Sequence, residues 1–161
     1  MIVALSQSSV RNAVKELNRY RESLPSRLDR ALEMLAEIGV TAAQGSVRMS
    51  EIDVAAAIRF EKAGEHCYLI ISDDERAAFT EFGTGVAGEG TYPGELPPEW
   101  GYDLRWTPAA HDPEHPEKWY YYDDQGRRRS TWGQMADAYM LTGSEVMRQT
   151  VRAAFEEAFR R

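Results

Sequence analysis

The sequence predicts an α+β fold, and changes in hydrophobic period along the chain are the main reason. Up to about residue 45, apolar side chains recur every three or four residues, which is the spacing of an amphipathic helix. Between residues 52 and 72 the spacing falls to two, which indicates a β-hairpin. Helical spacing returns after residue 142. Helical and strand segments therefore occupy separate parts of the chain, without the alternation of an α/β fold.

The N-terminal stripe predicts two helices, or one helix that is broken at Pro25. Ser8 and Ser9 are candidate N-caps for the first helix. Pro25 lacks the N–H that a helix interior needs. Ser26 follows it, with Asp29 three residues later, a pattern that resembles a capping box and would start a second helix.

The first hairpin is predicted from residues 52–60 and 66–72, with its turn at Lys62–Gly64. Cys67, in the second strand, is expected to be a small buried hydrophobic residue. It is the only cysteine, so an internal disulfide is excluded and nothing indicates an oxidising compartment. No stretch reaches the roughly 18 apolar residues of a membrane helix, so we expect a protein made in a cytoplasm.

A second hairpin and a final helix are predicted after residue 118. Trp119–Tyr122 is rich in strand formers, Asp123–Gly126 has turn composition, and Arg127–Trp132 can pair back. The basic triplet at 127–129 is interpreted as a solvated or ion-paired face of this hairpin. Thr142–Glu145 fits a capping box, which predicts the start of a helix that continues to the end of the chain.

Residues 84–116 differ from the rest in composition. They hold six of the seven prolines and five of the twelve glycines, with a local charge of −5. Such a segment cannot form a long helix or a central strand, and loops of this length are usually functional or disordered. Its aromatic residues include Tyr92, Trp100, Tyr102 and Trp106. A core explains some of them, and an interface with another protein explains them equally well.

Together the elements predict one domain over residues 1–161. Its N-terminal helices and its long C-terminal helix are expected to pack on a mostly antiparallel β-sheet. Residues 84–116 are expected to leave this domain as an extended loop or arm.

One glycine pattern invites a nucleotide-binding interpretation. Residues 83–88 read GTGVAG, which matches G-x-G-x-x-G, and Asp103 lies twenty residues after Gly83. The pattern needs a strand before it and a helix after its last glycine. Polar residues 73–76 precede it and Glu89–Pro93 opens no helix, so we expect the glycines to serve a turn. No cofactor is expected.

Metal and nucleic-acid sites are also disfavoured. His111 and His115 have the spacing of a helical zinc motif, but Pro113 between them forbids the helix that the motif requires. A net charge of −7 argues against nucleic acid as the main ligand, because phosphate contacts need a basic surface.

An enzyme remains the alternative from a different class. Acidic residues in the loop could act on carbohydrate or peptide as a pair of carboxylates, with tryptophans as a stacking platform. Glu95, Glu99 and Asp103 are the candidates for this hydrolase. Their spacing does not distinguish it from a solvated acidic loop, and an unassigned binding module is also left open.

The order of several motifs resembles one family of viral proteins. Phe79–Gly85 is followed by Tyr-Pro-Gly at 92–94, by the Trp119–Tyr122 strand, and by Thr-Trp-Gly at 131–133. This order is similar to that of the tailed-bacteriophage head–tail joining or tail-completion proteins, also described as minor capsid or neck proteins. The motif that leads into the loop consists of Glu81, Phe82, Gly83, Thr84 and Gly85.

The resemblance implies a non-enzymatic structural protein of the virion of a phage or prophage. It implies a small α+β sandwich that forms a ring, with six copies between the connector of the head and the tail tube. The partners would be other copies of the chain and the connector and tail-tube proteins, with no membrane. The protein would be made in the host bacterial cytoplasm. The loop at 84–116 would reach a neighbouring subunit through its aromatic residues.

Overall fold

The computed structural model of the protein describes residues 6–95, 114–123 and 125–160. The elements in chain order are α1 (Gln7–Ser46), η1 (Met49–Glu51), α2 (Ile52–Ala56), β1 (Ile58–Gly64), β2 (Cys67–Ser72), α3 (Ala77–Phe82), α4 (Gly85–Gly88), β3 (Trp119–Tyr122), β4 (Arg128–Thr131) and α5 (Tyr139–Ala158). The predicted α+β class is confirmed. In the described part of the chain, the antiparallel strands form two separate two-stranded sheets.

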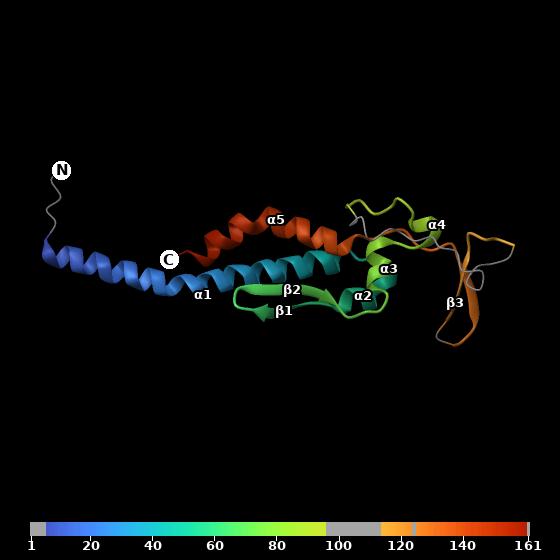
Figure 1. Ribbon diagram of the computed structural model, residues 1–161, viewed down its shortest axis with the longest axis horizontal. Helices are drawn as coiled ribbons and strands as arrows, with labels where there is room; N and C mark the ends of the chain where they lie inside the picture. The colour runs from blue at the N-terminus through green and yellow to red at the C-terminus, as the bar shows by residue number, and fades with distance from the viewer. Residues whose placement is uncertain (1–5, 96–113, 124, 161) are drawn as a thin grey trace.

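The molecule is elongated and is built along α1 (Figure 1). Helix α5 and the hairpin of β1 and β2 both pack on the C-terminal half of α1. The N-terminal half of α1 projects beyond them at one end. The hairpin of β3 and β4 lies at the opposite end (Figure 1). Both ends therefore extend away from the packed centre.

Helix α1 runs without interruption for 40 residues, so the predicted break at Pro25 is wrong. Pro25 is exposed, and the carbonyl that it leaves without an N–H donor can be hydrated instead. The helix bends between its two halves rather than ending (Figure 1). It begins after Ser6, which forms a capping box with Ser9: the Ser6 hydroxyl accepts the Ser9 N–H at 3.1 Å.

Residues 52–56 are helical, and here the predicted strand is wrong. Val54 and Ile58 are both buried in the core, and their spacing of four suits one face of a helix as well as alternate residues of a strand. Three consecutive alanines at 55–57 favour the helix. The strand starts only at Ile58, where pairing with Ser72 becomes available.

The first hairpin is present, with its turn two residues later than predicted. Gly64 pairs with Cys67, so Glu65 and His66 form the turn, and His66 has a positive φ of 53°. Tyr68 contacts Asp29 of α1, which places it on the inner face of the hairpin. Cys67 alternates with it on the outer face and is exposed. The expected burial of Cys67 is therefore wrong.

Helices α1 and α5 approach each other through small residues. A Cβ atom on Gly143 would lie 2.7 Å from the carbonyl oxygen of Gly39 and 3.2 Å from the Cβ of Ala43. The adjoining core cluster consists of Ala43, Val54, Ile58 and Tyr139. These contacts join both helices to the short helix α2 and to the start of β1.

The second hairpin forms as predicted, with Trp119 opposite Thr131 and Tyr122 opposite Arg128. The Asp123 carboxylate accepts hydrogen bonds from Arg127 Nε at 2.9 Å and from Arg129 Nε at 3.1 Å. The backbone N–H of Arg127, and after it these side-chain donors, hold the pKa of Asp123 below its ordinary value. The guanidinium of Arg128 lies 4.2 Å from the centre of the Tyr120 ring. The basic triplet is thus an ion-paired and stacked face.

The close helix approach predicts that Gly143→Ala and Gly45→Ala will have opposite effects. The added methyl at 143 would meet the backbone of α1, so we expect the free energy of unfolding to fall by about 1–3 kcal/mol. A Cβ on Gly45, also helical, would meet nothing within 4 Å. There, alanine should raise the free energy of unfolding by up to about 1 kcal/mol. Urea unfolding of both variants checks this, and equal stability would contradict the close approach.

Candidate functional site

The motif at 81–85 and the Thr-Trp-Gly motif at 131–133 are far apart in the sequence, but the structure brings them together. Thr84 and Gln134 form an antiparallel bridge in which the Thr84 N–H donates to the Gln134 carbonyl at 2.8 Å and the Gln134 N–H donates back at 3.1 Å. The Ala87 N–H donates to the carbonyl of Trp132 at 3.1 Å. We call this contact between residues 81–88 and 131–141 the junction.

Glycines are required in the junction because two backbone segments touch there. Gly83 has a φ of 78°, and a Cβ atom on it would lie 2.7 Å from the Ala136 nitrogen. Gly133 has a φ of 91°, and a Cβ on it would overlap the carbonyl oxygen of Thr84. Helix α3 precedes the first glycine where a nucleotide site needs a strand, and α4 is a single turn within the motif. The glycines therefore serve the backbone, as the sequence predicts, whereas Asp103 lies outside the described residues.

Glu81 is the buried carboxylate of the junction, with only 4% of its surface exposed. One oxygen accepts the Met140 N–H at 2.7 Å and the other accepts the Leu141 N–H at 3.1 Å. These two N–H groups belong to the first turn of α5, and the N–H groups of a first turn have no carbonyl acceptor within their own helix. Glu81 thus caps a helix that begins 58 residues later in the chain, and its charge suits the positive end of the helix dipole.

Helix α5 has no cap from its own sequence. It begins after Ala138, which has a left-handed φ of 47° and provides no side-chain hydrogen bond. The capping box predicted at Thr142–Glu145 is wrong, because Thr142 lies inside the helix and its hydroxyl donates to the Ala138 carbonyl at 3.0 Å. A distant carboxylate replaces the local cap, and sequence periodicity carries no signal for it.

Tyr92 completes the environment of Glu81. Its hydroxyl is hydrogen-bonded to the Glu81 carboxylate, and its ring packs edge-on against Phe82 with 5.0 Å between ring centres. Burial raises the pKa of Glu81 above its ordinary value, while the hydrogen bonds from the helix and from Tyr92 lower it in part. Among the predicted interface aromatics, Tyr92 thus contacts its own chain, whereas Trp100, Tyr102 and Trp106 lie outside the described residues.

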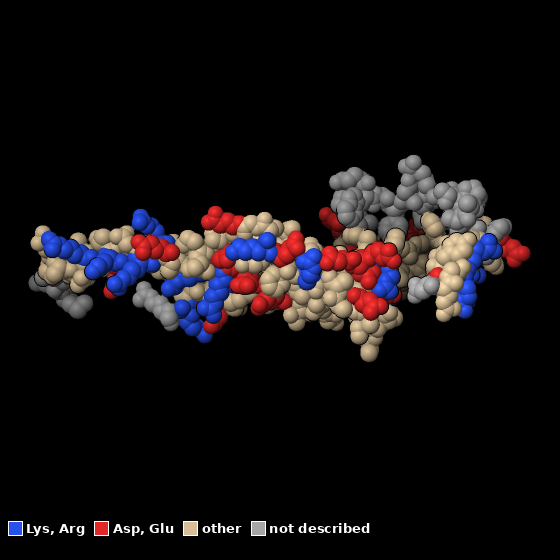
Figure 2. Space-filling view, turned by 90° about the horizontal axis from the view of Figure 1, so that it is seen from below, with Lys and Arg blue, Asp and Glu red and all other residues tan. Residues whose placement is uncertain are grey.

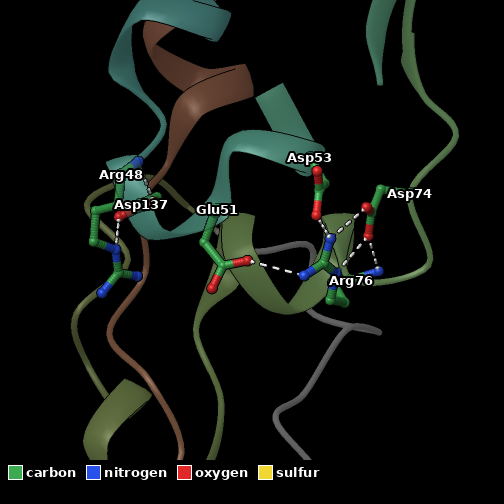
Figure 3. A network of polar contacts seen from close by, with 6 residues as sticks. All are labelled: Arg48, Glu51, Asp53, Asp74, Arg76 and Asp137. Atoms are coloured by element: carbon green, nitrogen blue, oxygen red, sulfur yellow. Dashed lines mark hydrogen bonds and ion pairs between the residues drawn. The ribbon is translucent and has the colours of Figure 1, made fainter. Parts of the chain in front are cut away.

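Arginine networks hold the ends of the neighbouring helices beside the junction (Figure 3). Arg48, just after α1, pairs with Asp137 before α5, and its backbone N–H donates to the same carboxylate at 3.0 Å. Arg76 contacts Asp74 at 2.8 Å and Glu51 and Asp53 at 3.6 Å. Its hydrogen bonds hold the pKa of Asp74 below the ordinary value.

A further polar cluster fixes the tip of the first hairpin on α1. Asp29 accepts hydrogen bonds from Lys62 Nζ at 2.5 Å and from the Tyr68 hydroxyl at 3.2 Å. The Lys62 hydrogen bond is the main reason that the pKa of Asp29 is lowered. His66 Nδ1 lies 3.6 Å from the second Asp29 oxygen. The cluster joins α1 to both strands.

Only some of the residues considered for hydrolase or metal chemistry lie within the described part of the chain. Glu95 is exposed, and Glu99, Asp103 and His111 lie outside the described residues. His115 lies 3.9 Å from Glu117 and near the Trp132 ring. Within residues 6–95, 114–123 and 125–160, no group of three or more His, Cys, Asp or Glu side chains could hold a metal ion.

Apolar surface is left uncovered at both ends of the molecule. At one end the exposed residues are Tyr121, Tyr122 and Trp132 of the second hairpin and its exit. At the other end they lie on the first turns of α1. The spacing of apolar residues predicts the stripe of α1 but does not show that its first turns are uncovered. The difference in helix length is the signal that would have revealed the uncovered part, since α1 has 40 residues and α5, which packs on it, has 20.

Comparisons with known protein families, with curated proteins and with solved structures gave no match for this chain. None of the helices in the described residues is both long enough and apolar enough to cross a membrane.

Loss of one acceptor oxygen at Glu81 tests the cap. We expect Glu81→Gln to lower the free energy of unfolding by about 1–3 kcal/mol, because an amide cannot accept both α5 N–H groups. Hydrogen exchange at Met140 and Leu141 should accelerate. Glu145→Gln, an exposed position on the same helix, should change neither property. Unchanged exchange in Glu81→Gln would show that the carboxylate does not cap α5.

The raised pKa of Glu81 predicts the direction of the pH dependence. The folded state holds the Glu81 proton more tightly than the unfolded state, so this contribution to stability is complete below pH 4.5 and is lost as pH rises through the raised pKa. The difference in free energy of unfolding between the natural chain and Glu81→Gln should therefore shrink as pH rises. Tyr92→Phe removes a donor and should raise the Glu81 pKa further, as carboxyl NMR titration can measure.

Proposed function

We propose that this protein is a non-enzymatic structural component of the virion of a tailed phage or prophage. In this proposal it joins head and tail as part of a neck or tail-completion ring of six copies. Its partners are its own copies and the connector and tail-tube proteins, and it is made in the host bacterial cytoplasm before it enters the virion.

The observation that carries this proposal is the uncovered apolar surface at the ends of an elongated molecule. Val10, Val14 and Leu17 on α1 are all exposed, and so are Tyr121 and Tyr122 on the second hairpin. Large exposed apolar patches are uncommon on monomeric proteins and mark interaction sites. A connecting protein needs such a surface at more than one place, because it contacts different neighbours at once.

The junction gives the motif resemblance a physical meaning. The motif at 81–85 and the Thr-Trp-Gly at 131–133 are two of the segments that carry the resemblance. Their backbones lie in contact, and hydrogen bonds from Thr84 to Gln134 and from Ala87 to Trp132 hold them together. The junction positions both the start of the loop at residue 84 and the end of the second hairpin. A chain that presents these two segments to neighbours needs a rigid base for them, and the capped, glycine-dependent junction is suited to this role.

Deletion of the gene from the phage or prophage that encodes the protein tests the proposal. Electron micrographs should show filled heads and separate tails, and the intact gene supplied on a plasmid should restore joined particles. Normal joined, infectious particles from the deletion would contradict the proposed function.

Two sets of variants test whether joining depends on the exposed tyrosines or on the acidic residues of the loop. Tyr121→Ser with Tyr122→Ser removes exposed aromatic surface and should leave heads and tails unjoined. Gln125→Ser, at the tip of the same hairpin, is the matched control and should restore particles fully. The triple variant Glu95→Gln, Glu99→Gln and Asp103→Asn should also restore particles, because a joining role needs no catalytic carboxylates. Loss of joining in the triple variant alone would favour the hydrolase.

A further inference from the structure

The first turns of α1 form an exposed arm with one apolar stripe and basic residues on either side of it. All of residues 6–22 are exposed; we call them the arm. Val10, Val14 and Leu17 are exposed to 46%, 51% and 66%. Their spacing of four and three is that of a helix-pairing seam. The same seam continues along α1 through Leu24, Leu28, Ala31 and Leu35.

Helix α5 covers the second part of this seam and then ends. Close to its C-terminal end, Arg27 Nη1 of α1 donates to the Phe159 carbonyl at 3.2 Å. The arm therefore continues an existing helix interface, with an apolar stripe of the same spacing, beyond the point at which its partner ends. A segment that covered the arm would extend this interface.

The charge of the arm indicates what can cover it. Arg11, Lys15, Arg19 and Arg21 outnumber Glu16 and Glu22, so the arm is positive in a chain of net charge −7. Basic side chains gather over this end of the molecule (Figure 2). Two arms laid against each other would bring like charges together. An apolar surface with acidic flanks is the complementary partner.

The chain carries one such surface, which we call the acidic face: residues 49–53 and 73–79. Arg76 holds the two segments together through Glu51 and Asp53 (Figure 3). Three large apolar side chains on the face are unusually exposed, namely Met49 at 96%, Ile52 at 70% and Phe79 at 57%. The acidic residues of the two segments are Glu51, Asp53, Asp73, Asp74 and Glu75, against Arg76 within the segments and Arg59, which pairs with Asp73 at 2.9 Å.

The arm cannot reach the acidic face of its own chain. The continuous helix from Val14 to Ser46 separates them by about 50 Å, at 1.5 Å per residue. The arm projects at one end of the molecule, and α2 and α3 lie beyond the other end of α1 (Figure 1). The complementary surfaces can therefore meet only between different copies, and where this contact is head-to-tail it closes into a ring or continues as a filament.

We propose that the arm of one copy docks on the acidic face of a second copy. Val10, Val14 and Leu17 cover Met49, Ile52 and Phe79, and the basic side chains of the arm face the surrounding carboxylates. This deepens the proposed function, on which it rests for its setting in a ring, by naming the surfaces that join neighbouring subunits.

Charge reversal on each side, followed by mixing, tests the proposal. Arg11→Glu with Lys15→Glu inactivates the arm, and Asp53→Lys with Glu75→Lys inactivates the face. By sedimentation at low salt, the natural chain should self-associate, and each variant alone should associate at least tenfold more weakly. A mixture of the two should recover self-association, because the natural arm can meet the natural face and the acidic reversed arm can meet the basic reversed face. Circular dichroism confirms that both variants are folded.

Chemical cross-linking provides a second test that tolerates weak association. In a Cys67→Ser background, chains with Val14→Cys are mixed with chains with Ile52→Cys and treated with a short bis-maleimide. A mixed dimer should form, and it should disappear with the arm reversal. Leu69→Cys, an exposed apolar position on β2, replaces Ile52→Cys in the control and should give none.

The outcomes separate this proposal from the proposed function. Failure of the mixture to recover self-association together with absence of the mixed cross-linked dimer overturns the docking, as does a cross-link equally strong with Leu69→Cys. Self-association that the arm reversal leaves unchanged also overturns it. If the arm reversal instead abolishes only the binding of purified connector rings, the occupant is another protein and the proposal is wrong. A specific cross-link in a protein whose gene deletion leaves joined particles would support the docking and contradict only the proposed function.

Discussion

The mismatch in length between α1 and α5 is the constraint on which this structure depends. One apolar stripe runs along the 40 residues of α1, and the helix that packs on it has 20. Where both are present, small residues at Gly39 and Gly143 let the backbones approach closely, and the first hairpin covers the other side. Where α5 ends, the stripe continues without cover. The packed centre and the exposed arm are therefore consequences of the same helix.

The position of α5 depends in turn on the junction. Its first turn is capped by Glu81, and Asp137 just before it is held by Arg48. The bridge between Thr84 and Gln134 fixes the chain that leads into α5. The motif at 81–85 thus acts within the fold, by connecting the helical centre to the loop and to the second hairpin, while the surfaces available to partners lie elsewhere.

Sequence reasoning identified the elements whose signals are local. The stripe of α1, the two hairpins, the terminal helix and the turn role of the glycines all follow from spacing and composition. It failed where distant contacts decide. Pro25 ends a helix by its local preference, yet α1 continues through it, and Val54 fits either a strand or a helix until its burial beside Ile58 is known. The cap of α5 could not be predicted, because nothing near residue 139 indicates a carboxylate at Glu81.

The proposed docking requires that assembly covers the exposed arm. Hydrogen–deuterium exchange of residues 6–22, compared between dilute protein and assembled rings or particles, tests this most directly. We expect fast exchange of the arm in dilute protein, and strong protection on assembly that appears together with protection of residues 49–53 and 73–79. An arm that exchanges equally fast in both states would contradict it.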